Sequence, residues 1–198
     1  MTREKIKPFY YKDLMGGAII NSKICDKILN YYKKNKHLAQ EGIINYGNKS
    51  NIIDKKIKES KEIIFDYKQF FSLFPEYGKV LNEAFSHYKR KYPFVNENYW
   101  FNIKGSIKIQ HYKKNQGFKK WHAENTGVGD GAKRILVFLT YLNDVKDGGT
   151  IFHHQDVTTP AKKGLTLIWP AGWTHIHKGQ ISKTKEKYIV TGWYYFLT

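Results

Sequence analysis

Short segments rich in β-branched and aromatic residues fill the second half of the chain and limit the folds that it can adopt. From Tyr99 onward, clusters of Gly, Asn, Asp or Pro separate most of these segments. No segment with helical periodicity lies between them, so antiparallel pairing in a sandwich or barrel is expected. The segments are SIKIQHY at 106–112, KRILVFLTYLND at 133–144, GTIFHH at 149–154, GLTLIWP at 164–170 and KYIVTGWYYFL at 187–197.

The first half has a different pattern, with apolar residues at helical spacing. Residues 22–36 and 76–92 each carry one apolar stripe, which predicts two amphipathic helices that pack on a core. No internal repeat or low-complexity linker divides the chain, whose length suits one domain. We therefore predict a single α+β domain over residues 1–198, with a mostly helical part, 1–98, packed against a β core, 99–198.

Nothing in the sequence indicates a membrane segment or an oxidising compartment. No apolar run approaches the ~20 residues that a membrane-spanning helix needs. The first residues, MTREKIKPFYYKDL, lack the apolar region of a secretory signal. Cys25 is the only cysteine, which excludes an intramolecular disulfide and a cysteine zinc cluster. We expect a soluble cytoplasmic protein with no membrane partner.

The formal net charge of +17 raises the question of nucleic-acid binding. Only Arg3, Arg90 and Arg134 of the 34 basic residues are arginines, and the 31 lysines are scattered along the chain. Arginine is preferred where a planar group must recognise phosphates or bases. We therefore interpret the lysines as a compositional bias and keep nucleic-acid binding as an alternative.

Two motifs, 55 residues apart, carry side chains suited to a metal ion. The first holds His122 and Glu124, and the second holds His177, with Lys187 ten residues later and Trp193 six after that. A His-x-Glu triplet alone is often just two hydrogen-bonded polar side chains. Two histidines and one carboxylate on neighbouring strands, however, can bind one face of an octahedral iron and leave three positions open.

The lysine suits an anion in such a site. Lys187 shares one face of its strand with Ile189, Thr191 and Trp193 by the period of two, so one cation is expected among inward-facing neighbours. A co-substrate that chelates iron through an α-keto acid has a second carboxylate, and burial of that anion requires a cation. The alternative is a solvated lysine, common in this composition.

Several motifs follow one another in a familiar order. They are Tyr112, WHAE at 121–124, YLNDVKDGGTIF at 141–152, LTLIWPAGWTHIHKG at 165–179, KEKY at 185–188 and Trp193. In their order and in the spacings around Lys187, they resemble the iron(II)- and 2-oxoglutarate-dependent dioxygenases. The match is to the prolyl 4-hydroxylase-like branch, including its short bacterial and phage members, and it covers residues 99–198.

The resemblance implies a double-stranded β-helix, or jelly roll, for this half. It also implies Fe(II), 2-oxoglutarate and O2, with ascorbate as an optional reductant. The residues that match the family's site are His122, Glu124 and His177 for iron, Lys187 and Tyr112 for 2-oxoglutarate, and Thr150 and Trp193 for the lining of the same pocket. The expected activity is hydroxylation of prolyl residues in a peptide or protein, with succinate and CO2 as products.

Other functions are open at this point. Within the same chemistry, the substrate is alternatively a free amino acid, a small metabolite or a nucleobase. From a different class, the chain is alternatively a catalytically silent basic jelly-roll binding module. The arginine typical of nucleic-acid demethylating relatives is absent from the last strands, where Lys187 stands, and this argues against a nucleobase.

The chain departs from the family pattern at three points. Glu124 stands where most relatives have aspartate, which raises the question of whether the longer side chain reaches the metal; a glutamate there would block the halide of halogenating relatives. The DGGTIF segment is one residue short, which makes the placement of Thr150 insecure. His175 competes with His177, although the ten-residue spacing to Lys187 selects His177.

Two further features have no assigned role. His153 and His154 are expected at the surface or on the substrate side, as ordinary polar residues. Residues 45–60 lie in a polar, then lysine-rich, connection, which is either a solvated loop or a lid over the site.

Overall fold

The computed structural model describes residues 6–46, 49–97 and 99–197. Its largest sheet has the strand order β1-β2-β12-β9-β14-β8-β6-β3, and β7 also pairs with β14. The strands of this sheet are β1 (Lys7–Tyr10), β2 (Gly16–Ile19), β3 (Gln40–Glu41), β6 (Lys61–Asp66), β7 (Phe101–Ile103), β8 (Ser106–Tyr112), β9 (Arg134–Tyr141), β12 (Leu165–Pro170) and β14 (Lys187–Phe196).

A smaller sheet and a separate hairpin complete the strand inventory. The smaller sheet has the order β11-β10-β13, and β4 pairs only with β5. All of these pairings are antiparallel. The strands are β4 (Ile44–Tyr46), β5 (Lys49–Ile52), β10 (Val145–Phe152), β11 (Val157–Ala161) and β13 (His177–Gly179).

The two sheets enclose an inner core, which is the arrangement of a jelly roll. Along β14, Ile189, Trp193 and Tyr195 belong to this core, whereas Val190 and Tyr194 belong to a second core on the other side of the sheet. Because successive side chains of a strand alternate between faces, the large sheet is apolar on both sides. The predicted α+β jelly roll is confirmed.

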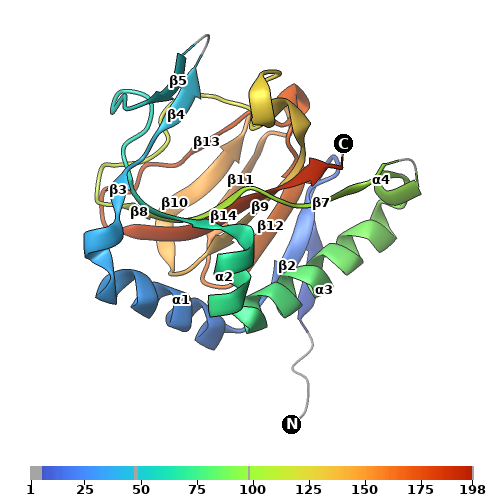
Figure 1. Cartoon of the computed structure of the whole chain (residues 1–198), viewed down its shortest axis with the longest axis horizontal. Helices are drawn as coiled ribbons and strands as arrows, with labels where there is room; N and C mark the ends of the chain where they lie inside the picture. The colour runs from blue at the N-terminus through green and yellow to red at the C-terminus, as the bar shows by residue number, and fades with distance from the viewer. Residues whose placement is uncertain (1–5, 47–48, 98, 198) are drawn as a thin grey trace.

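Helices cover the outer face of the large sheet, as Figure 1 shows for α1 and α3. The helices are α1 (Ser22–Lys34), α2 (Tyr67–Leu73), α3 (Pro75–Lys91) and α4 (Phe94–Glu97). Helix α1 begins where the Asn21 side chain accepts a hydrogen bond from the Lys23 amide, and α3 begins with Pro75, which needs no amide partner there. The two helices predicted from apolar stripes are both present.

The first half of the chain contains more strand than the sequence indicated. Strands β1, β2, β3 and β6 all come from residues 1–98 and extend the large sheet at both ends. Helices cover more of the part before residue 99 than strands do, but four of its short segments are strands that find their partners only in the tertiary fold. None of the helices in the described part of the chain is long and apolar enough to cross a membrane.

Candidate metal centre and its two cavities

Backbone pairing at the open end of the jelly roll brings the first and last residues of the candidate triad together. His122 and His177 form an isolated antiparallel bridge, in which each amide donates to the other carbonyl at 3.0 Å. The amide of Glu124 donates to the carbonyl of Ala171 at 3.1 Å, just beyond the end of β12. Main-chain hydrogen bonds at both His122 and Glu124 thus hold the first motif against the segment that leads to His177.

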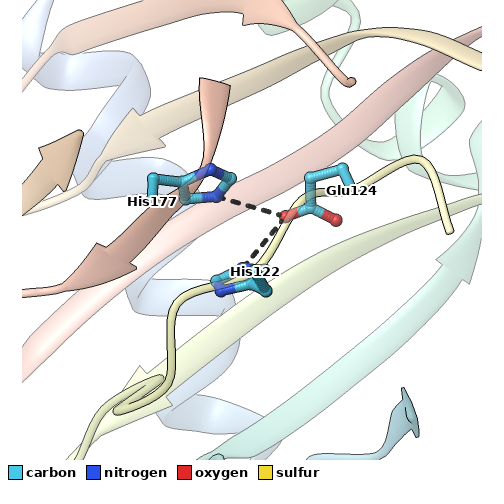
Figure 2. A group of neighbouring side chains, drawn as sticks. All are labelled: His122, Glu124 and His177. Atoms are coloured by element: carbon cyan, nitrogen blue, oxygen red, sulfur yellow. Dashed lines mark ion pairs between the residues drawn. The ribbon is translucent and has the colours of Figure 1, made fainter. Parts of the chain in front are cut away.

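The three side chains converge on one point, as Figure 2 shows. One oxygen of Glu124, Oε1, lies 3.6 Å from Nε2 of His122 and 3.6 Å from Nε2 of His177. One ligand atom from each residue lies within 4.8 Å of the other two. His177 is buried, and the other two are largely shielded from solvent.

The hydrogen bonds of the imidazole rings fit a metal at this point. Nδ1 of His122 lies 3.0 Å from the carbonyl of Lys120, and Nδ1 of His177 lies 2.9 Å from the carbonyl of His175. A carbonyl only accepts, so Nδ1 carries the proton in each ring and Nε2 offers a lone pair toward Glu124. Such carbonyl partners orient histidine ligands in metal sites.

The charge state also fits a cation. Burial lowers the pKa of His122, which favours the neutral ring. Burial works against the charge on Glu124, but in the absence of a metal a proton on Nε2 of a neighbouring imidazole, hydrogen-bonded to this carboxylate, outweighs burial and holds the pKa of the carboxyl well below its usual range. Two lone pairs and a carboxylate that face one another repel unless a cation lies among them, and nitrogen and oxygen donors of this kind suit iron(II).

The second oxygen of Glu124 has its own partners. Oε2 accepts a hydrogen bond from Nε1 of Trp193 at 3.0 Å, and Nη1 of Arg134 lies 3.6 Å from it. Arg134 also donates to the carbonyl of Glu124 at 3.1 Å and stacks on the Trp193 ring, 3.9 Å from its centre. These contacts leave Oε1 directed at the histidines, so the longer side chain does reach the centre of the triad.

His175 points elsewhere. Its Nε2 lies 2.6 Å from the carbonyl of Asp13, and its Nδ1 lies 3.0 Å from the hydroxyl of Thr174. The ring is 3% exposed and is fixed between these groups. Only its main-chain carbonyl serves the triad, through the bond to His177. The geometry therefore brings together His122, Glu124 and His177 and leaves the side chain of His175 outside.

A narrow inner cavity lies on one side of the triad, between the sheets. Three of the four residues expected to contact 2-oxoglutarate line it, namely Lys187, Tyr112 and Thr150. The Thr150 hydroxyl lies 2.7 Å from that of Tyr141, so the shortened DGGTIF segment still directs this threonine inward. The register of β10 against β11 shifts just before it, between Val145 and Thr150, which accommodates the different length.

Lys187 places a buried ammonium group in this cavity. The residue is 5% exposed, and its Nζ donates to the carbonyls of Gly148 at 2.8 Å and Gln180 at 3.1 Å. Nζ forms no ion pair with a carboxylate of the described residues, although the more distant charge of Asp147 offsets part of the cost of burial. Burial lowers the pKa of Lys187 to about 8. A cation without a counterion, at the base of a cavity that reaches the triad, suits one carboxylate of a bound acid.

Trp193 was expected in the same pocket, and the structure corrects this placement. Its ring lines a second, outer cavity of about 320 Å³ on the other side of the triad. Trp193 does share a face with Lys187, but six residues of strand separate them, or roughly 20 Å. The alternation of faces along β14 is confirmed, but this distance places Trp193 beyond the inner cavity.

Five residues line both cavities and separate them: Gln110, Phe118, His122, Glu124 and Thr191. Phe118 stacks on His122 with the ring centres 3.5 Å apart. Gln110 accepts hydrogen bonds from Tyr112 at 3.0 Å and Thr191 at 3.2 Å. The triad thus faces a narrow cavity with a buried cation on one side and a larger one on the other.

Residues 45–60 lie partly outside the described residues, at 47–48. The remainder includes the β4–β5 hairpin, at the far end of the molecule from α1 in Figure 1. Ile43, just before β4, and Ile44, the first residue of β4, line the outer cavity, and so does Lys58. The hairpin therefore adjoins the site, and its movement as a lid stays a prediction.

His153 and His154 are exposed, as expected, and they form part of a row of aromatic rings. Trp121 contacts His153 with ring centres 5.0 Å apart, and His153 contacts His154 at 5.0 Å. Trp173 follows at 6.3 Å and is 72% exposed. This row begins at the residue before His122 and runs over the surface beside the triad.

The sequence analysis did not predict several residues of the site. Arg134 contacts Glu124, and Tyr141 contacts Thr150. Gln110 lines both cavities. Arg134 is one of three arginines in a chain with 31 lysines, and this rarity was an available signal. Its planar group stacks on an aromatic ring, for which lysine is a poor substitute. Gln110 and Tyr141 are ordinary strand residues by pattern, and no signal marked them.

Part of the chain matches a known protein family. Residues 107–195 match the model of the 2OG-Fe(II) oxygenase superfamily. They contain all three triad residues and Lys187. This segment is therefore similar to the 2OG-Fe(II) oxygenases, a family whose name specifies 2-oxoglutarate and Fe(II). No protein of curated function matches the sequence.

Several solved structures with a similar fold are prolyl hydroxylases. The viral collagen prolyl hydroxylase of Paramecium Bursaria Chlorella virus-1, in its 2OG complex, aligns with a TM-score of 0.62 at 16% identity, over 97% of this chain and 96% of that one. A Trichoplax adhaerens prolyl hydroxylase in complex with a hypoxia inducible factor peptide fragment gives 0.69 at 16%, over 91% and 82%. A Pseudomonas putida prolyl-4-hydroxylase gives 0.59 at 11%, over 93% and 92%. The chain thus has the same fold as these prolyl hydroxylases.

Proposed function

We propose that this protein is an iron(II)- and 2-oxoglutarate-dependent dioxygenase that hydroxylates prolyl residues in a peptide or protein. Its ligands to iron are Nε2 of His122, Oε1 of Glu124 and Nε2 of His177. The single observation that carries the assignment is the position of this triad between two cavities of different character. When bound, iron, 2-oxoglutarate and O2 supply the oxidation: one oxygen atom enters a substrate C–H bond as hydroxyl, the other enters succinate, and CO2 is released.

The inner cavity is the site for 2-oxoglutarate in this proposal. The ammonium of Lys187 neutralises the distal carboxylate, and the hydroxyls of Thr150 and Tyr141 offer hydrogen bonds beside it. Tyr112 forms one wall, with its ring centre 5.3 Å from the Lys187 Nζ. A preorganised cation in a site screened from water binds an anion more strongly than an exposed lysine does.

The outer cavity receives the substrate. It is larger than the inner cavity, and it reaches His122 and Glu124 from the opposite side. Arg134 and Trp193 keep the Glu124 carboxylate in place at the border of the two cavities. The protein thereby separates the co-substrate from the carbon to be oxidised and presents both to the same point, which is how positioning accelerates a reaction.

The row of rings beside the triad supports a peptide as substrate. Trp121, His153, His154 and Trp173 present aromatic surface along a line, which suits an extended proline-rich segment. The Trichoplax structure, which has the same fold, was solved with a peptide fragment bound. A free amino acid needs only the cavity and would leave this row without a role.

Mass spectrometry tests the proposal. Proline-containing peptides are incubated with the protein, Fe(II), 2-oxoglutarate and ascorbate in air, and each is paired with the same peptide carrying alanine for proline. A gain of one oxygen atom in the proline peptide only, together with succinate, is the expected result. The His177→Ala variant serves as the control without a complete triad. Succinate formation with no oxygenated peptide would reject a prolyl substrate and leave the dioxygenase class intact.

A further inference from the structure

Two ammonium groups lie on one wall of the outer cavity. Lys58 is 5% exposed, and the side chain of Lys108 is 13% exposed. The Nζ of Lys58 lies 5.6 Å from the centre of the Phe118 ring, and that ring stacks on His122. The Nζ of Lys108 lies 5.9 Å from the centre of the Trp193 ring. Both cations are therefore one aromatic ring away from the triad.

One carboxylate serves both lysines. The Oε1 atom of Glu62 lies 2.5 Å from the Nζ of Lys58, and Oε2 lies 3.3 Å from the Nζ of Lys108. Glu62 is fully buried in β6, and Oε1 also accepts from Ser60 and Gln110. Oε2 has no hydrogen-bond partner of good geometry. Two cations share one anion, and one positive charge is left over.

No other acidic group of the cavity balances this charge. Among the described residues that line it, Glu124 is the only carboxylate, and its oxygens are directed at the histidines, Trp193 and Arg134. Burial lowers the pKa of Lys58, which expresses the cost of holding its charge away from water. A buried excess cation is costly unless an anion joins it. Most other lysines in the described part of the chain are exposed to solvent. The low exposure of Lys58 and Lys108 is therefore not explained by the high lysine content alone.

We propose that the substrate carries an anionic oxygen group, a carboxylate or a phosphate, that binds at Lys58 and Lys108 while the oxidised C–H bond faces the triad. For a peptide, this means an acidic or phosphorylated residue close to the target proline. The inference rests on the proposed function, because it takes the outer cavity as the place of the substrate.

Calorimetry on the protein loaded with Fe(II) and 2-oxoglutarate, without oxygen, tests this directly. The probes are one proline peptide with Asp, Asn or phosphoserine beside the proline, and free N-acetylaspartate as the small-molecule arm. The variant is Lys108→Gln, which leaves Glu62 paired with Lys58. The matched control is Lys33→Gln, at an exposed position of α1. Urea unfolding midpoints establish that both variants fold.

The expected result is that the Asp or phosphoserine peptide binds about tenfold or more tightly than the Asn peptide, because a charge pair in a partly desolvated site is measurable. Lys108→Gln is expected to reduce this ratio to about one, and Lys33→Gln to leave it unchanged. Binding of N-acetylaspartate with no preference among the peptides would support a small acidic substrate instead of a peptide. Equal binding of all probes, or no binding of any, would overturn the proposal.

The two proposals fail in different ways. After oxygen is admitted, an Asn peptide hydroxylated as fast as the Asp peptide contradicts the anion site and leaves the prolyl assignment standing. An acidic peptide that binds tightly but gains no oxygen supports the anion site and contradicts the prolyl assignment. If Lys108→Gln does not fold, the ratio of Asp to Asn binding in the unmodified protein still decides the question.

Discussion

Replacing Lys187 with methionine isolates the charge that the inner cavity buries. Burial lowers the pKa of this ammonium from 10.5 to about 8. This lowering corresponds to ~3 kcal/mol of unfavourable free energy for the charged form in the folded protein. Methionine has a similar length and no charge, so the variant retains the packing and removes this cost.

The dependence of stability on pH follows from the two pKa values. Below pH 8, the folded and unfolded chains both hold the proton on Lys187, and the cost is present in full. Between about pH 8 and 10.5, the unfolded chain holds more protons, so the free energy of unfolding rises with pH. From near pH 7 to near pH 9, this single group adds ~1.3 kcal/mol to the stability of the unmodified protein and nothing to the variant.

Urea unfolding of the metal-free protein measures this difference. The free energy of unfolding is determined at both pH values for the unmodified chain and Lys187→Met, and the change with pH is compared so that all other titrating groups cancel. Lys185→Met, at an exposed position two residues before Lys187, is the control with no expected difference. A pH-independent gap between Lys187→Met and the unmodified protein would falsify the inference that a lone ammonium is buried there.

Added 2-oxoglutarate is expected to stabilise the unmodified protein most below about pH 8, where Lys187 is charged, which is opposite to the pH dependence of the ligand-free protein. At a concentration about a hundredfold above its dissociation constant, a ligand stabilises the folded state by about 2.7 kcal/mol. Because the distal carboxylate needs the charged form of Lys187, this stabilisation is expected to decline above pH 8 and to be lost in Lys187→Met. Equal stabilisation of the variant would move the carboxylate to another site.

Further predictions concern the triad and the domain. His177→Ala is expected to abolish the visible absorption band of the Fe(II) and 2-oxoglutarate complex, whereas His175→Ala is expected to keep most of it; the opposite pattern would reverse the choice of ligand. Glu124→Asp withdraws the carboxylate by about one bond length, ~1.5 Å, and is expected to weaken iron binding about tenfold in metal titrations. Trp193→Phe removes the hydrogen bond to Glu124 and is expected to weaken iron binding by a similar factor, and an unchanged affinity would make that bond irrelevant. If the chain is one domain, fluorescence and circular dichroism give coincident unfolding transitions, and separated transitions would indicate two units.

Local pattern predicted much of the β core. The segments at 106–112, 164–170 and 187–197 coincide with β8, β12 and β14 to within a residue, because each combines β-branched or aromatic residues with clear turn signals. The alternation along β14 also gave the correct face for Lys187, which the structure buries. Periodicity and turn chemistry are properties of neighbouring residues, so a single sequence records them.

Elements stabilised by distant partners were missed. Strands β1 and β2 have four residues each, and β13 has three. Segments of this length have little pattern of their own and become strands through their neighbours in the sheet. Helix α2 covers only Tyr67–Leu73, too short for a helical period to stand out, and it begins where the Asp66 side chain caps the Lys68 amide at 2.8 Å.

Burial of two lysines beside the triad could not be predicted from the amino-acid composition. Among 31 lysines, the described part of the chain fully buries only Lys58 and Lys187, and they lie on opposite sides of the triad. The sequence singled out Lys187 because a nearby histidine fixed its spacing, whereas Lys58 comes from the connection before β6 and meets Lys108 only after β6 and β8 pair. Burial distinguishes these lysines from the compositional excess, since a solvated ammonium has no need of a partner and a buried one does. In the inner cavity the expected partner is the distal carboxylate of 2-oxoglutarate, and the same reasoning, applied to the outer cavity, leads to an anion on the substrate.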